Sequence, residues 1–162
     1  MPEQFLPTSV DQLPTRETTM SMSGLDFMQK ILEGELPLAP IANGLNYQLQ
    51  DVQLDQVIFR GAPGFEQMNP TGTIHGGWYG TLLDSAMACA IMTRVPKGSV
   101  YTTLEYKVNI IRPIRPGTSV DCIGVVEHAG RSTGVATGKI VGVEDGKLYA
   151  TGSTTCIIMT PK

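Results

Sequence analysis

The pattern of apolar and polar positions changes its period three times along the chain. Apolar residues recur at helical spacing in the stretch SGLDFMQKILEGELP, which Ser21 or Ser23 can cap and which Gly34 and Pro37 end. This spacing predicts a short amphipathic helix. The preceding residues, 1–22, mix Pro, Thr, Gln and charged residues without a period, which is typical of a mobile or loosely docked arm.

After this helix the pattern becomes that of strands. LNYQLQDVQ alternates apolar and polar residues, and QVIFRGAP is rich in β-formers, so the two runs are predicted to pair antiparallel. Four more such runs follow: SVYTTLEYKVNIIRP, TSVDCIGVVEHAG, STGVATGKIVGVE and KLYATGSTTCIIM. They are separated at Gly117, at Gly130 and at Asp145-Gly146, which is the strongest two-residue hairpin signal. Short connections between consecutive strands predict an antiparallel meander.

Between the two groups of strands lies a third pattern. From Gly76 to Met92 the residues are apolar or small on every side, apart from Thr81, Asp84 and Ser85, which predicts a helix covered all round. The order helix, two strands, helix, four strands indicates one α+β domain over residues 23–162. We expect its antiparallel sheet to curl around the long central helix.

Composition and charge limit the classes of function that the chain can have. A chain of 162 residues with a net charge of −3 and no Lys/Arg cluster is unlike a nucleic-acid-binding protein. The longest apolar run is shorter than a membrane span and contains Asp84, and no signal-peptide pattern opens the chain. We therefore expect a soluble cytoplasmic protein without a membrane partner.

The cysteines and histidines give no metal pattern. Cys89, Cys122 and Cys156 are far apart in apolar surroundings, which predicts buried thiols in a reducing compartment. The two histidines, His75 and His128, show no metal-ligand spacing with them, so no metal is expected.

Asp84 is the residue that does not fit its surroundings. A carboxylate in an apolar helix is costly unless it is paired or hydrogen-bonded, and no basic residue lies within one helical turn of it. It therefore faces a partner from elsewhere in the chain, or a polar cavity. Asp84 either marks a functional site or only shapes the fold by accepting hydrogen bonds from a loop.

The start of the same helix has complementary chemistry. His75-Gly76-Gly77 places two glycines where the first N–H groups of a helix are unsatisfied and the dipole is positive. A missing side chain lets a substrate carbonyl approach these N–H groups closely. The other interpretation is that the glycines only relieve crowding between helix and sheet.

Helical geometry separates these two features. His75 and Asp84 are nine residues apart, which at about 100° per residue puts them on opposite sides of the helix and about 13 Å apart along it. They cannot form a dyad within one chain. If the glycine end polarises a carbonyl that Asp84 attacks, the two halves of the site come from two copies related by a two-fold axis.

The stretches NPTGTIHGGWYGTLLDSAMACA and YTTLEYKVNIIRPIRPG resemble the hotdog-fold acyl-CoA thioesterases, specifically the PaaI-like group of phenylacetic acid degradation. The resemblance covers about residues 41–159. It implies a long helix wrapped by a curved antiparallel sheet, protomers that pair edge to edge, and a homotetramer made of two such dimers. It also implies hydrolysis of acyl-CoA without a cofactor.

The resemblance also implies roles for single residues. Asp84 corresponds to the nucleophile or general base, and Gly77, with Gly76 as the alternative, corresponds to the donor to the carbonyl. Asn69 corresponds to the residue that assists at the carbonyl or orders the site, and His75 to the motif histidine beside it. Thr103 falls where the family has a Ser or Thr that holds water. Thr102 takes that place if the register shifts by one.

Other expectations concern the rest of the substrate and the competing functions. Arg112 and Arg115 on one turn, and Arg131 with Ser132 on another, are candidates for binding the phosphates of CoA, or else ordinary solvated residues. His75 is either a general base or a hydrogen-bonding residue at the helix start. The alternatives to a thioesterase are a hotdog enoyl-CoA hydratase or dehydratase and a non-catalytic acyl-CoA-binding module.

Overall fold

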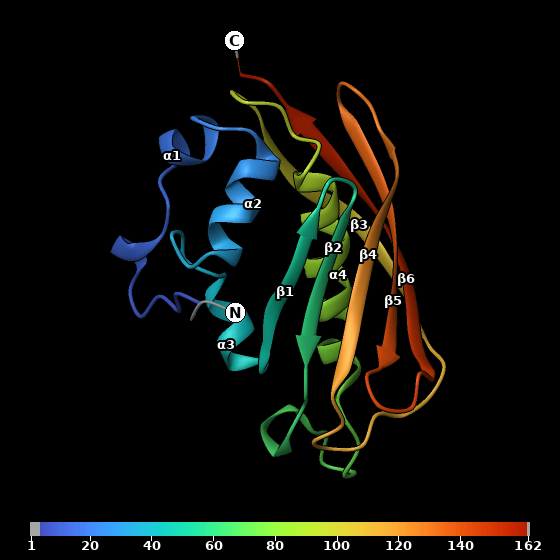
Figure 1. Cartoon of the computed structure of the whole chain (residues 1–162). Helices are drawn as coiled ribbons and strands as arrows, with labels where there is room; N and C mark the ends of the chain where they lie inside the picture. The colour runs from blue at the N-terminus through green and yellow to red at the C-terminus, as the bar shows by residue number, and fades with distance from the viewer. Residues whose placement is uncertain (1–3, 162) are drawn as a thin grey trace.

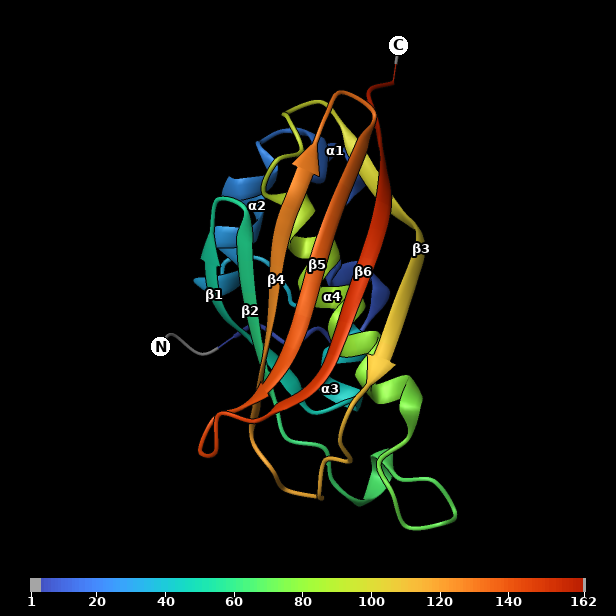
Figure 2. The same ribbon diagram turned by 90° about the vertical axis from the view of Figure 1, so that its right-hand side faces the viewer.

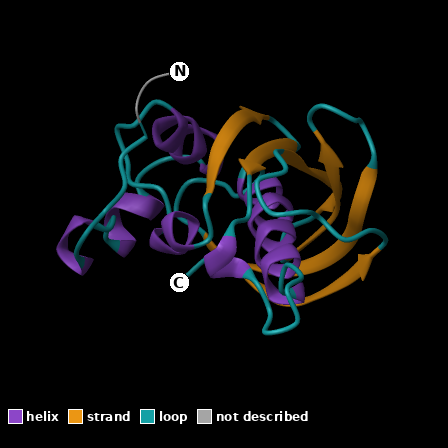
Figure 3. Cartoon of the chain, turned by 90° about the horizontal axis from the view of Figure 1, so that it is seen from below, coloured by secondary structure: helices purple, strands orange, loops and turns teal. Residues whose placement is uncertain are grey.

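The computed structural model of the chain describes residues 4–161 and contains one six-stranded sheet wrapped around one long helix (Figures 1 and 3). All paired strands are antiparallel, and their order across the sheet is β1-β2-β4-β5-β6-β3. The strands are β1 Tyr47–Gln53, β2 Gln56–Gly61, β3 Val100–Ile110, β4 Val120–Ala129, β5 Thr133–Gly142 and β6 Leu148–Met159. The helices are α1 Arg16–Met20, α2 Gly24–Leu32, α3 Pro40–Gly44 and α4 Gly76–Met92, with short 3-10 turns η1 Val10–Gln12 and η2 Phe65–Gln67. The α+β hotdog architecture expected from the sequence is confirmed.

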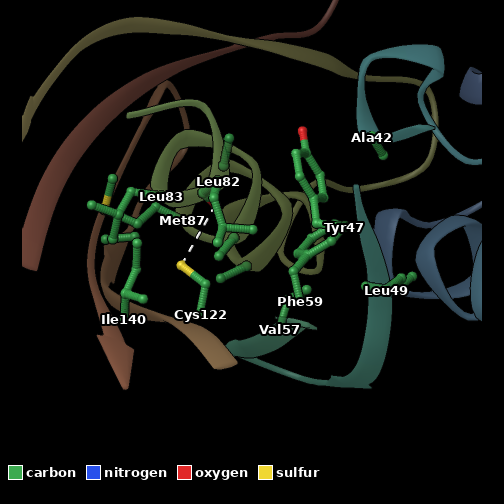
Figure 4. Packing of buried hydrophobic residues seen from close by; sticks show 14 of the residues in the cluster. Ala42, Tyr47, Leu49, Val57, Phe59, Leu82, Leu83, Met87, Cys122 and Ile140 are labelled. Carbon is green, nitrogen blue, oxygen red and sulfur yellow. Dashed lines mark hydrogen bonds between the residues drawn. The ribbon is translucent and has the colours of Figure 1, made fainter. Parts of the chain in front are cut away.

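Helix α4 fills the concave face of the sheet and supplies much of the core (Figure 4). Its buried Leu82, Leu83 and Met87 pack against inward-facing residues of the strands, such as Cys122 and Ile140. The approach is close because β4 carries a glycine at the contact: a Cβ on Gly124 would lie 2.2 Å from the Ala86 carbonyl oxygen. Side chains alternate in direction along each strand, so one face of the sheet is buried. Small residues on that face set the distance between the sheet and α4.

The predicted meander is wrong at one connection. Strand β3 does not pair with β4; it pairs with β6 at one edge of the sheet, while β4 lies between β2 and β5. Residues 111–119 between them form an extended Pro-rich connection that crosses the end of the sheet rather than a tight turn (Figure 2). The Asp145-Gly146 hairpin does join β5 to β6, with Gly146 at φ +62°, although its connection comprises residues 143–147.

The N-terminal helix is confirmed as α2, whose first turn is capped by the Ser23 side chain accepting from the Asp26 N–H. Residues 1–22 were expected to form an arm, and its described part contains η1 and α1, which the sequence pattern did not indicate. The Gln4 amide hydrogen-bonds both the N–H and the carbonyl of Leu49 on β1, and the Phe5 carbonyl accepts from the Leu38 N–H. The arm therefore covers part of the outer edge of β1.

The opposite edge of the sheet is different. Along β3 most side chains are exposed, including three large apolar ones, Leu104 at 59%, Ile110 at 50% and Tyr106 at 47%. The strand also carries a bulge between Thr103 and Glu105. Within the described chain, the outer edge of β3 has no strand beside it. The two edge strands of the sheet are thus unequal, one covered and one open.

Two expectations about burial are met in part. Cys122 and Cys156 are buried as predicted, whereas Cys89 is half-buried, and all three thiols are free. Helix α4 is not covered all round, because Thr81, Asp84, Ser85 and Cys89 stay half-exposed along one side of it. None of the helices in the described part of the chain is long and apolar enough to cross a membrane.

Candidate active site

Asp84 lies midway along α4 on the half-exposed stripe of the helix, beside β3. The Thr103 hydroxyl donates to its Oδ1 at 3.1 Å. Burial raises the pKa of Asp84 above its usual value of 3.8, and the hydrogen bond from Thr103 opposes that rise. The result is a half-buried carboxylate that is more basic than a solvated aspartate and has one oxygen aligned with a hydroxyl.

Thr103, rather than Thr102, is the threonine that reaches Asp84. Side chains alternate along β3, so the exposed Thr102 faces away from α4. Thr103 Oγ1 also lies 3.8 Å from the Cys156 sulfur, and Cys156 pairs with Thr103 across β3 and β6. The hydroxyl is therefore placed between Asp84 and the buried interior of the sheet.

The start of α4 is exposed and has a specific hydrogen-bond arrangement. His75 is the N-cap residue, and its Nδ1 accepts from the Gly77 N–H at 2.8 Å. In a neutral ring this leaves the proton on Nε2. No hydrogen bond within the described chain uses the Gly76 N–H. Of the two candidate donors to a carbonyl, Gly76 is thus unengaged and Gly77 is engaged by the histidine.

Asn69 belongs to the loop that leads into α4. Its side-chain amide donates to Thr73 Oγ1 at 2.8 Å, and its backbone N–H donates to the Thr73 carbonyl at 2.7 Å. Gly72, at φ +82°, makes the turn between them. Asn69 therefore orders the loop that presents His75, and no described hydrogen bond joins it to Asp84.

The structure does not bring the two halves of the expected site together within one chain. No described hydrogen bond joins Asp84 to His75, Gly76 or Gly77. Strand β3 runs along α4 in the opposite direction: Thr103 lies at Asp84, and a Cβ on Gly76 would lie 3.5 Å from Ile110 Cδ1. The helix start and the carboxylate thus lie along the same open edge of the sheet, about 12 Å apart.

The predicted phosphate-binding residues lie at opposite ends of the sheet. Arg112 follows β3, near the start of α4, and its Nη1 donates to the Leu148 carbonyl at 2.6 Å. Arg131 and Ser132 form the turn between β4 and β5 and are exposed. The ten residues of β4 separate these ends by about 33 Å, so one chain cannot place both on the same phosphate.

A polar pair beside Asp84 was not expected from the sequence. The Tyr47 hydroxyl lies 2.9 Å from Ser85 Oγ, and burial raises the pKa of Tyr47 to about 12, so the phenol stays protonated. In the sequence, Ser85 is only one of three polar residues in the apolar helix. The alternation that turns Tyr47 inward was visible in the sequence, but the contact with α4 depends on how β1 packs.

A metal site is not evident around Asp84. Among the described residues, no group of three or more His, Cys, Asp or Glu side chains is placed to hold a metal ion. Cys89 is close in sequence to Asp84, but burial raises the pKa of its thiol to about 12, which disfavours the thiolate. The Asp84 carboxylate and the Thr103 hydroxyl are the candidate reactive groups of the site.

The profile of the Thioesterase superfamily matches residues 71–149, which include the start of α4, Asp84 and Thr103. The match covers just under half of the chain, which is therefore similar to members of this superfamily. Together with the solved structures described next, it supports a thioester hydrolase of the PaaI-like hotdog type. Among curated proteins, no significant match to the chain was found.

Solved structures of hotdog thioesterases resemble the chain over most of its length. A point mutant of the phenylacetic acid degradation protein PaaI from Thermus thermophilus is 26% identical, with a TM-score of 0.67 over 74% of this chain and 98% of that one. A phenylacetic acid degradation-related putative thioesterase from Ralstonia eutropha is also 26% identical, with a TM-score of 0.73 over 81% and 98%. PaaI from Escherichia coli, 19% identical, shares the fold at a TM-score of 0.70 over 86% and 96%.

Proposed function

We propose that this thioesterase hydrolyses acyl-CoA to a free carboxylic acid and CoA, with Asp84 as the nucleophile or the general base. The observation that carries the proposal is the Asp84–Thr103 pair on the open side of α4. A half-buried carboxylate of raised pKa is a better base than a solvated one. The neighbouring hydroxyl can hold a water molecule at the carboxylate.

Two reaction routes are consistent with the Asp84–Thr103 pair. As a base, Asp84 takes a proton from water held by Thr103, and the resulting hydroxide adds to the thioester carbon. As a nucleophile, a carboxylate oxygen of Asp84 adds to that carbon, the CoA thiolate leaves, and water hydrolyses the mixed anhydride. In both routes the thiolate ends protonated as free CoA, and neither route requires a cofactor.

The start of α4 is proposed to polarise the thioester carbonyl. The unengaged Gly76 N–H can donate to the developing oxyanion without any rearrangement, whereas Gly77 must first release the ring of His75. The Nδ1 of His75 is occupied as an acceptor, which supports a hydrogen-bonding role for this residue rather than proton abstraction. Asn69 is assigned the ordering of the loop beside it.

A complete site is proposed to need two copies of the chain. The helix start and Asp84 lie about 12 Å apart along α4, too far to act on one carbonyl, so a two-fold axis that brings two α4 helices together joins one copy's helix start to the other's carboxylate. The open edge of β3, with exposed Leu104, Tyr106 and Ile110, supports pairing of the two sheets along this strand. The family resemblance extends this proposal to a tetramer made of two such dimers.

The cellular setting is proposed to be the cytoplasm. Three free thiols, two of them fully buried, fit a reducing compartment.

The first test is to measure release of free CoA from a panel of acyl-CoAs by the wild type and by Asp84→Asn. We expect kcat to fall by about 10²–10⁴-fold, as is typical when a general acid–base group is removed. Asp11→Asn is the matched control, because Asp11 lies in η1, exposed and distant in sequence from the site. Equal rates for the wild type and Asp84→Asn would rule out the proposed role of Asp84.

A further inference from the structure

Tyr106 is an exposed aromatic residue on the face of β3 that meets α4. Strand β3 runs beside α4 at the open edge of the sheet (Figure 2). Side chains alternate along a strand, and the bulge between Thr103 and Glu105 returns Tyr106 to the face of Thr103. The ring lies directly on the helix: a Cβ on Gly80 would be 3.4 Å from Tyr106 Cε2 and 3.5 Å from its hydroxyl oxygen. The side chain is still 47% exposed, so the ring also faces outward from its own chain.

Gly80 lies midway between the two halves of the proposed site. It comes four residues after Gly76 and four residues before Asp84, so it lies about 6 Å along the helix from each of them. Residues four apart are neighbours on one side of a helix, so the three positions form a row along α4. Tyr106 therefore covers the midpoint of this row.

The symmetry of a shared site places this midpoint at the two-fold axis. The proposed site needs the helix start of the second copy to lie beside Asp84 of the first. A two-fold axis passes through the point halfway between any atom and its symmetry copy. Here it therefore passes close to the point halfway between Gly76 and Asp84 of one chain, which is the position of Gly80. The two copies of Tyr106 consequently meet between the two sites.

The acyl group and the CoA arm of a bound substrate leave the carbonyl in different directions. The two carbonyl positions of the pair lie about 12 Å apart, and a CoA arm is much longer than this, so two CoA arms directed at the axis would collide. CoA therefore extends away from the axis toward solvent. The space between helix and sheet is already filled by buried side chains such as Leu83 and Met87. The direction toward the axis remains for the acyl group, and it ends at the ring of Tyr106.

We infer that Tyr106 limits the length of the acyl group, as a wall that the two copies share at the two-fold axis. The distance from the carbonyl to the axis is about 6 Å along the helix. Three bonds of an extended chain span about 3.5 Å, so this distance holds roughly five bonds of an acyl chain. Short-chain acyl-CoA is therefore the expected class of substrate. The inference rests on the proposed acyl-CoA thioesterase function and deepens it by naming a residue that selects the acyl group.

The first test measures CoA release from butanoyl-CoA and from octanoyl-CoA. For Tyr106→Ala we expect the ratio of kcat/KM for octanoyl-CoA to that for butanoyl-CoA to rise about tenfold or more, since each methylene that gains a place contributes up to about fourfold. Tyr106→Phe keeps the ring and should keep the wild-type ratio. Tyr106→Trp enlarges the wall and should lower the ratio. Hydrolysis of butanoyl-CoA shows that each variant is folded and assembled.

Lys107→Ala is the matched control, because Lys107 is exposed on the opposite face of the same strand. An unchanged ratio in Tyr106→Ala, or an equal rise in Lys107→Ala, would overturn the inference. If Tyr106→Ala hydrolyses neither thioester, Tyr106→Trp decides, and a ratio at or above that of the wild type would count against the wall.

A disulfide tests the place of Tyr106 without using activity. Two cysteines can be joined only when their Cα atoms lie within about 7 Å, so Tyr106→Cys at the axis should give a covalent dimer after mild oxidation, seen on a non-reducing gel. Asn109→Cys is the control, because it is exposed three residues farther along β3, and its two copies would lie about 20 Å apart. The wild type shows what the half-buried Cys89 contributes. No covalent dimer in Tyr106→Cys, or an equal yield in Asn109→Cys, would overturn the inference.

These measurements separate the inference from the proposed function. If the wild type releases CoA from neither thioester, the proposed function fails, while the disulfide still tests whether Tyr106 lies at the axis. Calorimetry with the same two acyl-CoAs then tests the wall through binding. Equal preference for butanoyl-CoA over octanoyl-CoA in the wild type and in Tyr106→Ala would overturn the inference in that case.

Discussion

At the scale of single residues, the Asp84–Thr103 pair sets the charge state on which the proposed activity depends. Burial raises the pKa of Asp84, and the hydrogen bond from Thr103, which favours the ionised form, limits that rise. Asp84 must be ionised to act as a base or nucleophile, so activity is lost as the pH falls through this pKa. The balance between burial and one hydrogen bond therefore decides where the acidic limb of the pH profile lies.

We expect kcat/KM of the wild type to fall in acid with a midpoint above the ordinary aspartate value of 3.8. Thr103→Val removes the hydrogen bond that lowers the pKa, so the midpoint should move to higher pH. Thr103→Ser keeps the hydroxyl and should leave the midpoint near that of the wild type. Full pH–rate profiles of the three proteins provide the measurement, and a midpoint that moves to lower pH in Thr103→Val would contradict the assignment.

At the scale of elements, the contact between α4 and β4 depends on a missing side chain. Gly124 lies where a Cβ would be 2.2 Å from the Ala86 carbonyl oxygen and 2.7 Å from the Met87 nitrogen, both in the helix backbone. Backbone of a buried helix cannot move aside as a flexible side chain can. Any larger residue must therefore displace α4 from the sheet, and with it Asp84.

We expect Gly124→Ala to lower the free energy of unfolding by about 2 kcal/mol or more, in the range known for overpacked cores. Gly44→Ala is the control: Gly44 lies at the end of α3, where an added Cβ meets no atom within 4 Å. Gly44→Ala should leave the free energy of unfolding almost unchanged. Urea denaturation of both variants gives the comparison, and equal stability of Gly124→Ala and the wild type would show that the contact can relax.

Local elements could be predicted from the sequence, whereas their arrangement could not. Helices α2 and α4 and all six strands follow from periodicity and from caps such as Ser23, because these signals act between neighbouring residues. The place of β3 beside β6 depends on how the Pro-rich connection crosses the sheet, which no local pattern encodes. In the site, Asp84 stood out as a charge in an apolar helix, but the contact of Tyr47 with Ser85 joins distant elements.

At the scale of the whole molecule, the open edge of β3 is where the proposed assembly and the proposed activity depend on each other. If two copies pair along this strand, each completes the other's site, so a change that separates the copies should also remove activity. Leu104, 59% exposed at the bulge of β3, is suited to such a change. A charged side chain at this position lowers the stability of an isolated chain only a little, because the position is exposed. It strongly disfavours the pairing of two β3 edges.

We expect Leu104→Lys to convert the protein to monomers and to reduce hydrolysis in the same proportion. Leu54→Lys is the control, since Leu54 is similarly exposed, at 50%, in the turn between β1 and β2. Sedimentation and CoA release, measured at the same protein concentrations, give both quantities. A monomeric Leu104→Lys protein with full activity would rule out a shared site.

The inequality of the two sheet edges limits how far such pairing can continue. The amide of Gln4 occupies the Leu49 backbone groups on the outer side of β1, so part of that edge is already taken by the chain itself. Growth of a fibril by strand pairing needs an unpaired strand edge on both sides of the sheet in every added molecule. If two copies pair along β3 as proposed, a molecule with one such edge forms a closed pair and then stops. On this proposal the N-terminal segment protects the protein from polymerisation as well as covering β1.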